Sequence, residues 1–197
     1  MHRLMMVFIG LLLAACNESY TPKPRGFFGI DLPEKKYRTS ELNCPFNFEY
    51  GSYAELDMRE EYCWFNITYP KLNGVIHMSY KSAGSNLRQH INNSHDLAYK
   101  HSRVAEGINE QEYRNPEKNV FGIVYDFEGH TATAMQFYLT DSSQHFIRGA
   151  LYFKNEMNDS ILPVSNFIKE DIYHLIESWQ WEQKKPSSFQ KRASSIF

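Results

Sequence analysis

The stretch VFGIVYDFEGHTATAMQFYLTDSSQHFIRGALYF, residues 120–153, decides the fold of this chain. Apolar and polar residues alternate in three runs, at 120–127, 131–140 and 145–153, as they do in strands with one buried face. Glu128-Gly129 predicts a tight hairpin between the first two runs, and residues 141–144 predict a second turn. Because links this short join antiparallel neighbours, the stretch predicts a three-stranded antiparallel meander.

A helix with one broad apolar face follows the meander. Residues 164–179 carry apolar side chains three or four positions apart, and Pro163 stands where a first-turn proline is tolerated. Such a face cannot remain in water, and the short link after residue 153 brings the helix back over the meander. The residues expected to pack on the sheet are Phe167, Ile168, Ile172, Leu175 and Ile176.

The first half of the chain predicts further strands and one more helix. The expected elements are strands at 27–32, 46–50, 64–69 and 75–80 and a helix at 86–106 with Ser85 as its N-cap. Tight turns rather than crossover helices join neighbouring strands, which predicts an α+β fold: a single antiparallel β-sheet domain with packed helices. The order of elements is reminiscent of the Mog1/PsbP-like sandwich.

The N-terminus predicts a lipid anchor. A basic start at residues 1–3 and an apolar run at 4–13 lead into Leu13-Ala14-Ala15-Cys16, the lipobox of bacterial lipoproteins. We therefore expect a signal peptide at 1–15 and acyl chains on Cys16 that hold the protein on a membrane. The apolar run is too short to span a bilayer, which needs about 20 residues. The alternatives are an ordinary secretory signal cleaved elsewhere and a buried helix.

The predicted mature chain has three parts. Residues 16–26 form the lipidated N-terminus and a Pro-rich tether, residues 27–182 the α+β domain, and residues 183–197 a disordered basic and Ser-rich tail. No Asp follows Cys16 and no acidic run begins the mature chain. This pattern favours an outer-membrane lipoprotein that faces the periplasm, although the inner membrane remains an alternative.

Two cysteines remain once Cys16 carries lipid. Cys44 and Cys63 are a disulfide candidate, because the periplasm is oxidising. The alternative is a pair of small buried thiols. Zinc is disfavoured, since neither a Cys-x-x-Cys motif nor a matching His pair accompanies them.

Charge and motifs disfavour nucleic acid, metal and catalysis. The net charge of −2 provides no basic footprint for nucleic acid. His90, His95 and His101 lack the i, i+3 or i, i+4 spacing that two metal ligands on a helix need. Asp141, Ser142 and His145 could form an acid, nucleophile and base, but their composition is ordinary for a turn and the chain has no Gly-x-Ser-x-Gly motif. We therefore expect no catalytic residue, no metal and no cofactor.

Aromatic residues are abundant, with 14 Phe, 13 Tyr and 3 Trp. Most should lie in the core. Alternation must turn some of the neighbouring aromatics outward, among Tyr50, Tyr53, Tyr62, Trp64, Phe137 and Tyr138. Exposed aromatics favour a protein-binding face.

Several long runs resemble one family, the gliding motility lipoprotein GldD family. They are YTPKPRG at 20–26, IDLPEKKY at 30–37, CWFNITYPKLNG at 63–74, QFYLTDS at 136–142 and HFIRGALYF at 145–153. The resemblance spans about residues 20–182. It implies an envelope lipoprotein of the Bacteroidota that is required for gliding and linked to type IX secretion, with no enzymatic activity. Its partners would be other gliding and secretion machinery proteins of the envelope, and its membrane contact would be the lipid on Cys16.

Two further expectations remain open. Asp159-Ser160-Ile161 fits the O-glycosylation pattern of that phylum, so Ser160 is a modification candidate, although a turn before the helix explains it equally well. The alternative function is a periplasmic small-ligand or glycan-binding lipoprotein whose outward aromatics stack on sugar.

Overall fold

The computed structural model describes residues 30–101, 105–129, 131–154 and 160–182, and its centre is one antiparallel sheet. The order of the seven strands across the sheet is β4-β5-β6-β10-β9-β8-β7. Their bounds are β4 Glu55–Met58, β5 Trp64–Tyr69, β6 Gly74–Ser82, β7 Gly107–Asn115, β8 Val120–Glu128, β9 Met135–Thr140 and β10 His145–Phe153. The expected α+β class, with a β8-β9-β10 meander, is confirmed.

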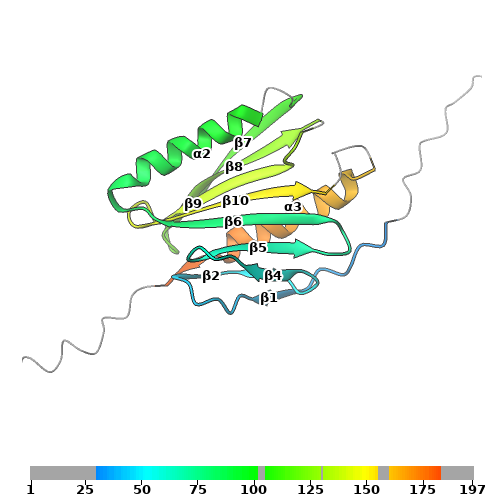
Figure 1. The fold of residues 1–197 in the computed structure, drawn as a ribbon, viewed down its shortest axis with the longest axis horizontal. Coiled ribbons are helices and arrows are strands. Elements are labelled where there is room, and N and C mark those ends of the chain that lie inside the picture. The colour runs from blue at the N-terminus through cyan, green and yellow to red at the C-terminus, as the bar shows by residue number, and fades with distance from the viewer. Residues whose placement is uncertain (1–29, 102–104, 130, 155–159, 183–197) are drawn as a thin grey trace, which may run out of the picture.

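Two helices and two short ladders complete the domain (Figure 1). The helix α2 (Leu87–His101) follows a 3₁₀ turn, η1 (Gly84–Asn86), and packs on one face of the sheet, whereas α3 (Leu162–Ser178) packs on the other. In the ladders, β1 (Tyr37–Thr39) pairs with β3 (Glu49–Gly51), and β2 (Phe46–Asn47) pairs with β11 (Gln180–Trp181).

Several predicted elements were wrong in detail. The link between β8 and β9 is no tight hairpin at Glu128-Gly129: β9 begins only at Met135. The Thr131 hydroxyl donates to the Thr133 carbonyl oxygen at 2.7 Å, and the Thr133 hydroxyl donates to the Leu151 carbonyl oxygen at 2.9 Å. These bonds hold the segment as a loop.

The other corrections lie in the first half of the chain. The helix expected at 86–106 ends at His101, Ser85 lies inside the 3₁₀ turn instead of capping the helix, and residues 107–115 form β7. The strand expected at 46–50 is divided at Phe48 into β2 and β3, because the two halves pair with different partners. Of the strand expected at 27–32, Ile30 to Leu32 have no strand structure and 27–29 lie outside the described residues.

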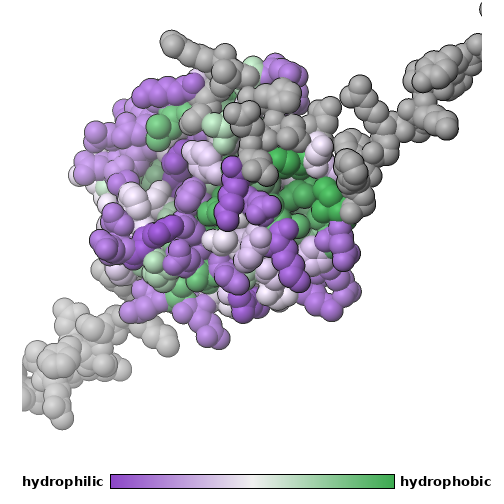
Figure 2. Space-filling view, turned by 45° about the vertical axis from the view of Figure 1, so that its right-hand side comes forward, coloured by the Kyte–Doolittle hydropathy of each residue, from purple (hydrophilic) through white to green (hydrophobic). Residues whose placement is uncertain are grey.

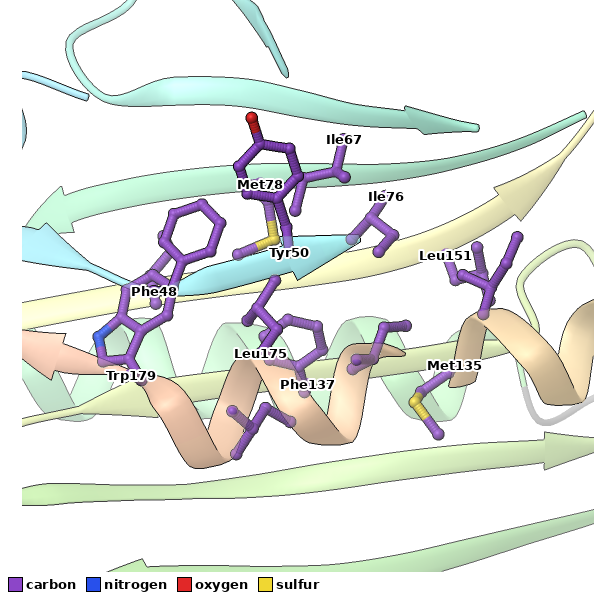
Figure 3. Close-up of a cluster of buried hydrophobic side chains, with 14 of the residues drawn as sticks. Phe48, Tyr50, Ile67, Ile76, Met78, Met135, Phe137, Leu151, Leu175 and Trp179 are labelled. Carbon is purple, nitrogen blue, oxygen red and sulfur yellow. The ribbon is translucent and has the colours of Figure 1, made fainter. Parts of the chain in front are cut away.

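The larger core lies between the sheet and α3 (Figure 3). Phe167, Ile168, Ile172, Leu175 and Ile176 are all buried there, which confirms the predicted packing face. They meet inward residues of the meander and of β5 and β6, among them Val124, Met135, Phe137, Leu151, Ile67 and Ile76. Trp179 follows the helix, is fully buried, and stacks on Phe48 with ring centroids 5.1 Å apart.

A polar clamp fastens the N-terminal segment to α3. Asp171 is only 1% exposed although it is ionisable, and its carboxylate accepts hydrogen bonds from Lys35 Nζ at 2.6 Å and from Tyr53 Oη at 2.9 Å. Tyr37 Oη adds a third at 3.1 Å. These donors satisfy the charge that burial would otherwise penalise.

The opposite face carries a smaller cluster beneath α2. Its buried members are Ala83, Ala98, Tyr125, Phe127, Tyr138 and Phe146. They come from β8, β9, β10, the helix and the link between β6 and η1, whereas β5 and β6 contribute none. α2 therefore covers only part of this face, along the β8–β10 side in Figure 1.

Candidate functional site

Several aromatic side chains, among them the exposed Tyr62, line a hollow at one end of the domain, which we call the end hollow. Its volume is about 700 Å³, and its lining includes Tyr62, Tyr80, Lys118, Asp141, His145 and Trp181. Tyr62 lies in the turn before β5, Tyr80 on β6 and Trp181 on β11. Lys118 comes from the β7–β8 turn, Asp141 from the β9–β10 turn, and His145 from the start of β10. The β2–β11 ladder brings Trp181 here from the far end of the sequence.

Ring contacts order the aromatic side of the end hollow. The His145 and Trp181 rings stack with centroids 5.2 Å apart and planes 14° apart, and Tyr62 meets Tyr80 edge-on at 6.1 Å. Tyr80 Oη lies 2.7 Å from His145 Nδ1. Tyr62 remains 68% exposed, more than any other large hydrophobic residue of the described chain. Burial, followed by the proximity of Tyr62 and Asp141, raises the pKa of Tyr80, which keeps its hydroxyl protonated as a donor.

The Cys44–Cys63 disulfide holds the turn that carries Tyr62. The two Cα atoms are 5.7 Å apart, and both residues are buried in the larger core. Cys63 directly follows Tyr62 and has a positive φ of 56°, a conformation that the bonded turn imposes. Tyr62 is therefore an exposed aromatic ring whose backbone is restrained by the neighbouring disulfide.

Asp141, Ser142 and His145 lie close in sequence here but form no catalytic triad. Asp141 Oδ1 accepts the backbone N–H groups of Ser143, Gln144 and His145 at 2.8–2.9 Å, which makes it the centre of a turn. Burial alone would raise the pKa of Asp141, but these N–H donors and the Ser143 hydroxyl lower it below its usual value. The ring nitrogen of His145 faces Tyr80 instead of Asp141.

A second hollow, the sheet-face basin, lies on the part of the sheet that α2 leaves open. It measures about 600 Å³ and is lined by residues of β5, β6 and β10 and of the turn before β5. The pairing register sets Trp64, Ser79 and Arg148 in one row across the sheet, and Asn66, His77 and Ala150 in the next row. Large side chains thus flank the small Ser79 and Ala150, and this difference in size makes the basin.

Sequence reasoning did not find Arg148, Lys118 or Trp181. Small residues at the outward positions Ser79 and Ala150 were a usable signal for the basin, but only with the strand register known. Of the aromatics expected to face outward, Tyr62 is exposed and Tyr53 and Trp64 are half-buried, whereas Tyr50, Phe137 and Tyr138 are buried.

The histidines of α2 have separate surroundings. His90 packs against the Phe146 ring at 5.5 Å, and His95 Nδ1 lies 3.2 Å from Tyr125 Oη. Within the described residues, no three His, Cys, Asp or Glu side chains come together as a metal site. His101 ends the helix.

The O-glycosylation candidate lies at the end of the domain opposite to the end hollow (Figure 1). Ser160 is exposed just before α3 and borders a small apolar hollow of about 170 Å³ with Ile30, Leu72 and Ile161. Cys16, the expected signal peptide and the expected tether lie outside the described residues, as does the expected tail at 183–197. In the view of Figure 2 most of the surface is hydrophilic, with the larger hydrophobic patch on the right and smaller ones elsewhere.

The family model for "Gliding motility lipoprotein GldD" matches residues 17–181, which include every strand and helix described above. The chain belongs to the GldD family of gliding motility lipoproteins. As a member of that family it is a membrane-anchored lipoprotein. None of the helices in the described ranges is long and apolar enough to cross a membrane.

No curated protein and no solved structure matches the chain. The expected likeness to the Mog1/PsbP-like sandwich therefore stays a prediction.

Proposed function

We propose that this GldD-family lipoprotein is a non-catalytic component of the gliding machinery that binds and stabilises other envelope components linked to type IX secretion. The family match over residues 17–181 is the observation that carries this proposal. The lipobox at residues 13–16 supports an anchor at Cys16, in the outer membrane facing the periplasm.

The end hollow is the surface that we propose for a protein partner. Aromatic residues are enriched in the energetically dominant positions of protein interfaces, because a large rigid ring loses little entropy on binding. Tyr62 is such a ring, since the neighbouring disulfide fixes its backbone and Tyr80 supports one edge. Lys118, Asp141 and Glu182 border it with charges of both signs, as in a polar interface rim. The hollow is open and partly charged, which favours a protein surface over a small apolar ligand.

The test replaces the aromatic anchor without touching the core. In the native host, Tyr62→Ala should impair gliding and lower the levels of the machinery components that the protein stabilises, while its own level stays unchanged. The matched control is Leu97→Ala on α2, where the side chain is 39% exposed and far from the hollow. Photo-crosslinking from position 62 should yield discrete adducts with envelope proteins. Normal gliding and no adduct for Tyr62→Ala would refute the proposed surface.

The anchor has a test of its own. Cys16→Ala should abolish palmitate labelling, because only the Cys16 sulfur can take the diacylglycerol, and should leave an uncleaved or unanchored form. Palmitate on this variant would contradict the lipobox assignment.

A further inference from the structure

The sheet-face basin contains an arginine without an acidic partner. Arg148 Nη2 donates to Gln136 Oε1 at 2.6 Å, and within the described part of the chain no carboxylate forms a salt bridge with it. Burial lowers the pKa of Arg148, opposed by Tyr152, yet a guanidinium remains charged in proteins. Arg148 is half-buried, so its charge is partly removed from water without an opposite charge beside it, and an anionic ligand would offset that cost.

The neighbouring residues hold Arg148 in place. Gln136 is only 1% exposed, and its Oε1 fixes one edge of the guanidinium. Its Nε2 has no hydrogen-bond partner among the described residues, so the amide is not part of any larger polar network that would neutralise the arginine. The Tyr152 side chain accepts a further hydrogen bond from Arg148. The N–H groups that remain lie in the plane of the guanidinium, where they can pair with a carboxylate.

Opposite Arg148 stands a fixed aromatic surface. Trp64 Nε1 donates to the Tyr80 carbonyl at 2.9 Å, which sets the indole in one orientation, and the ring is half-buried. Two strand spacings separate Trp64 from Arg148 in their row, about 10 Å. Ser79 lies between them, so a flat ring can rest against the indole while its acidic group reaches the guanidinium.

Polar groups complete the second row of the basin. Asn66 bonds the His77 ring nitrogen at 2.8 Å, and Arg59 lies against the Asn66 amide. Burial, with a smaller contribution from Arg59, lowers the pKa of His77, which leaves it a neutral donor or acceptor. Of the charged residues that line the basin, Arg59 and Arg148 are positive and Glu61 is negative. Lys81 adds a positive charge over the Trp64 ring, at 5.4 Å from its centroid.

We propose that the sheet-face basin binds a carboxylate-bearing saccharide, with the sugar ring on Trp64 and the carboxylate on Arg148. The aromatic face supplies stacking, the arginine selects the acid, and His77, held by Asn66 at one ring nitrogen, offers the other ring nitrogen to a hydroxyl group. This site is separate from the end hollow, so its failure would leave partner binding there untouched.

The test titrates the full chain in detergent with trigalacturonate and follows tryptophan fluorescence. We expect saturable binding that the methyl-esterified trimer lacks. Arg148→Gln should weaken it about tenfold or more, as loss of a charge-assisted contact does. The matched control is Arg114→Gln, at an exposed arginine on β7 that pairs with Glu112 at 2.7 Å, and it should bind like the parent.

Two further variants keep the test decisive if Arg148→Gln folds poorly. Ser79→Leu fills the floor of the basin without removing a charge, and it should abolish binding. Glu61→Gln removes the one acidic side chain of the lining and should tighten binding slightly. Equal binding of the ester, no binding of either trimer, or parent-like binding by Ser79→Leu would overturn the proposal. If tetraglutamate bound equally tightly through Arg148, the basin would recognise the carboxylate and not the sugar ring, and the saccharide part of the proposal would be refuted.

Discussion

The two faces of the sheet differ in how completely a helix covers them. On the α3 face, the neighbouring strands β5, β6, β10, β9 and β8 contribute to one continuous core. Trp179 and residues of β2 and β3 close the end of this core. On the α2 face, β8, β9 and β10 with Ile108 of β7 pack beneath the helix, and β5 and β6 face the sheet-face basin. The first face supplies stability, while the second retains an accessible polar surface.

The helices themselves explain this difference. α3 carries Ile168, Ile172, Leu175 and Ile176 on one side, and each is at most 1% exposed. In α2 the corresponding contacts are made by Ala98 and by the half-buried Leu87 and Ile91. A thin apolar stripe buries less area and therefore contributes less to stability.

The same substitution in the two helices tests the comparison, and α3 should respond most. Ile172→Ala should lower the free energy of unfolding by about 2 to 5 kcal/mol, because it leaves a cavity in a closed core. Urea denaturation followed by circular dichroism measures the change. A loss below about 1 kcal/mol would mean that α3 is not the main stabilising element.

The disulfide belongs to the α3 side and should have the next largest effect. Cys44→Ser together with Cys63→Ser should cost about 3 kcal/mol, since the bridge closes a loop with a sequence separation of 19. Thermal unfolding with and without reductant checks this. If reductant leaves the parent protein unchanged and the double variant unfolds at the same temperature, the bridge contributes nothing.

Ile91→Ala in α2 is the counterpart of Ile172→Ala in α3, and we expect it to cost less stability. The side chain is half-buried, so its loss should cost only about 1 kcal/mol. Hydrogen exchange of the α2 amides should accelerate selectively, because the helix opens more easily than the sheet beneath it. A cost equal to that of Ile172→Ala would remove the distinction between the faces.

The smallest effect concerns pH and the clamp on α3. Burial, followed by the charge of Asp171, raises the pKa of Tyr37 from 10 to about 12. The folded state keeps this proton while the unfolded state loses it, so the stabilisation is complete below pH 10 and disappears between pH 10 and about 12. Tyr37→Phe should flatten the decline of urea midpoints across that window. An unchanged decline would exclude Tyr37 as its source.

Sequence patterns predicted the strands that bury one face. The bounds 64–69 and 145–153 agree with β5 and β10, because aromatic and aliphatic residues alternate there between clear turns. β7 was missed, since residues 107–115 carry polar side chains on both faces, as an edge strand in water can. No local pattern could have divided 46–50 between two ladders, because the partners of β2 and β3 lie far away in the chain.

The candidate sites were less predictable than the fold. Alternation predicted that some aromatics of a set including Tyr62 and Trp64 face outward, whereas Trp181 reaches the end hollow only through pairing with Phe46. Arg148 is a candidate ligand-binding residue because no acidic side chain in the described residues pairs with it. Such a lack depends on the three-dimensional surroundings and cannot be read from the sequence. The turn composition around Asp141 agrees with the hydrogen-bonded turn that this residue centres.

The placement of the chain ends has a mechanical consequence. Ile30 and the β11 strand lie at opposite ends of the domain, and the long strands of the sheet run between those ends (Figure 1). If the domain is tethered beyond Ile30 and held by a partner at the end hollow, a pull acts along the strands. The hydrogen bonds that join β6, β10, β9 and β8 lie across the direction of this pull. A sheet pulled in this direction resists extension, which suits a protein that works where a cell drags its envelope over a surface.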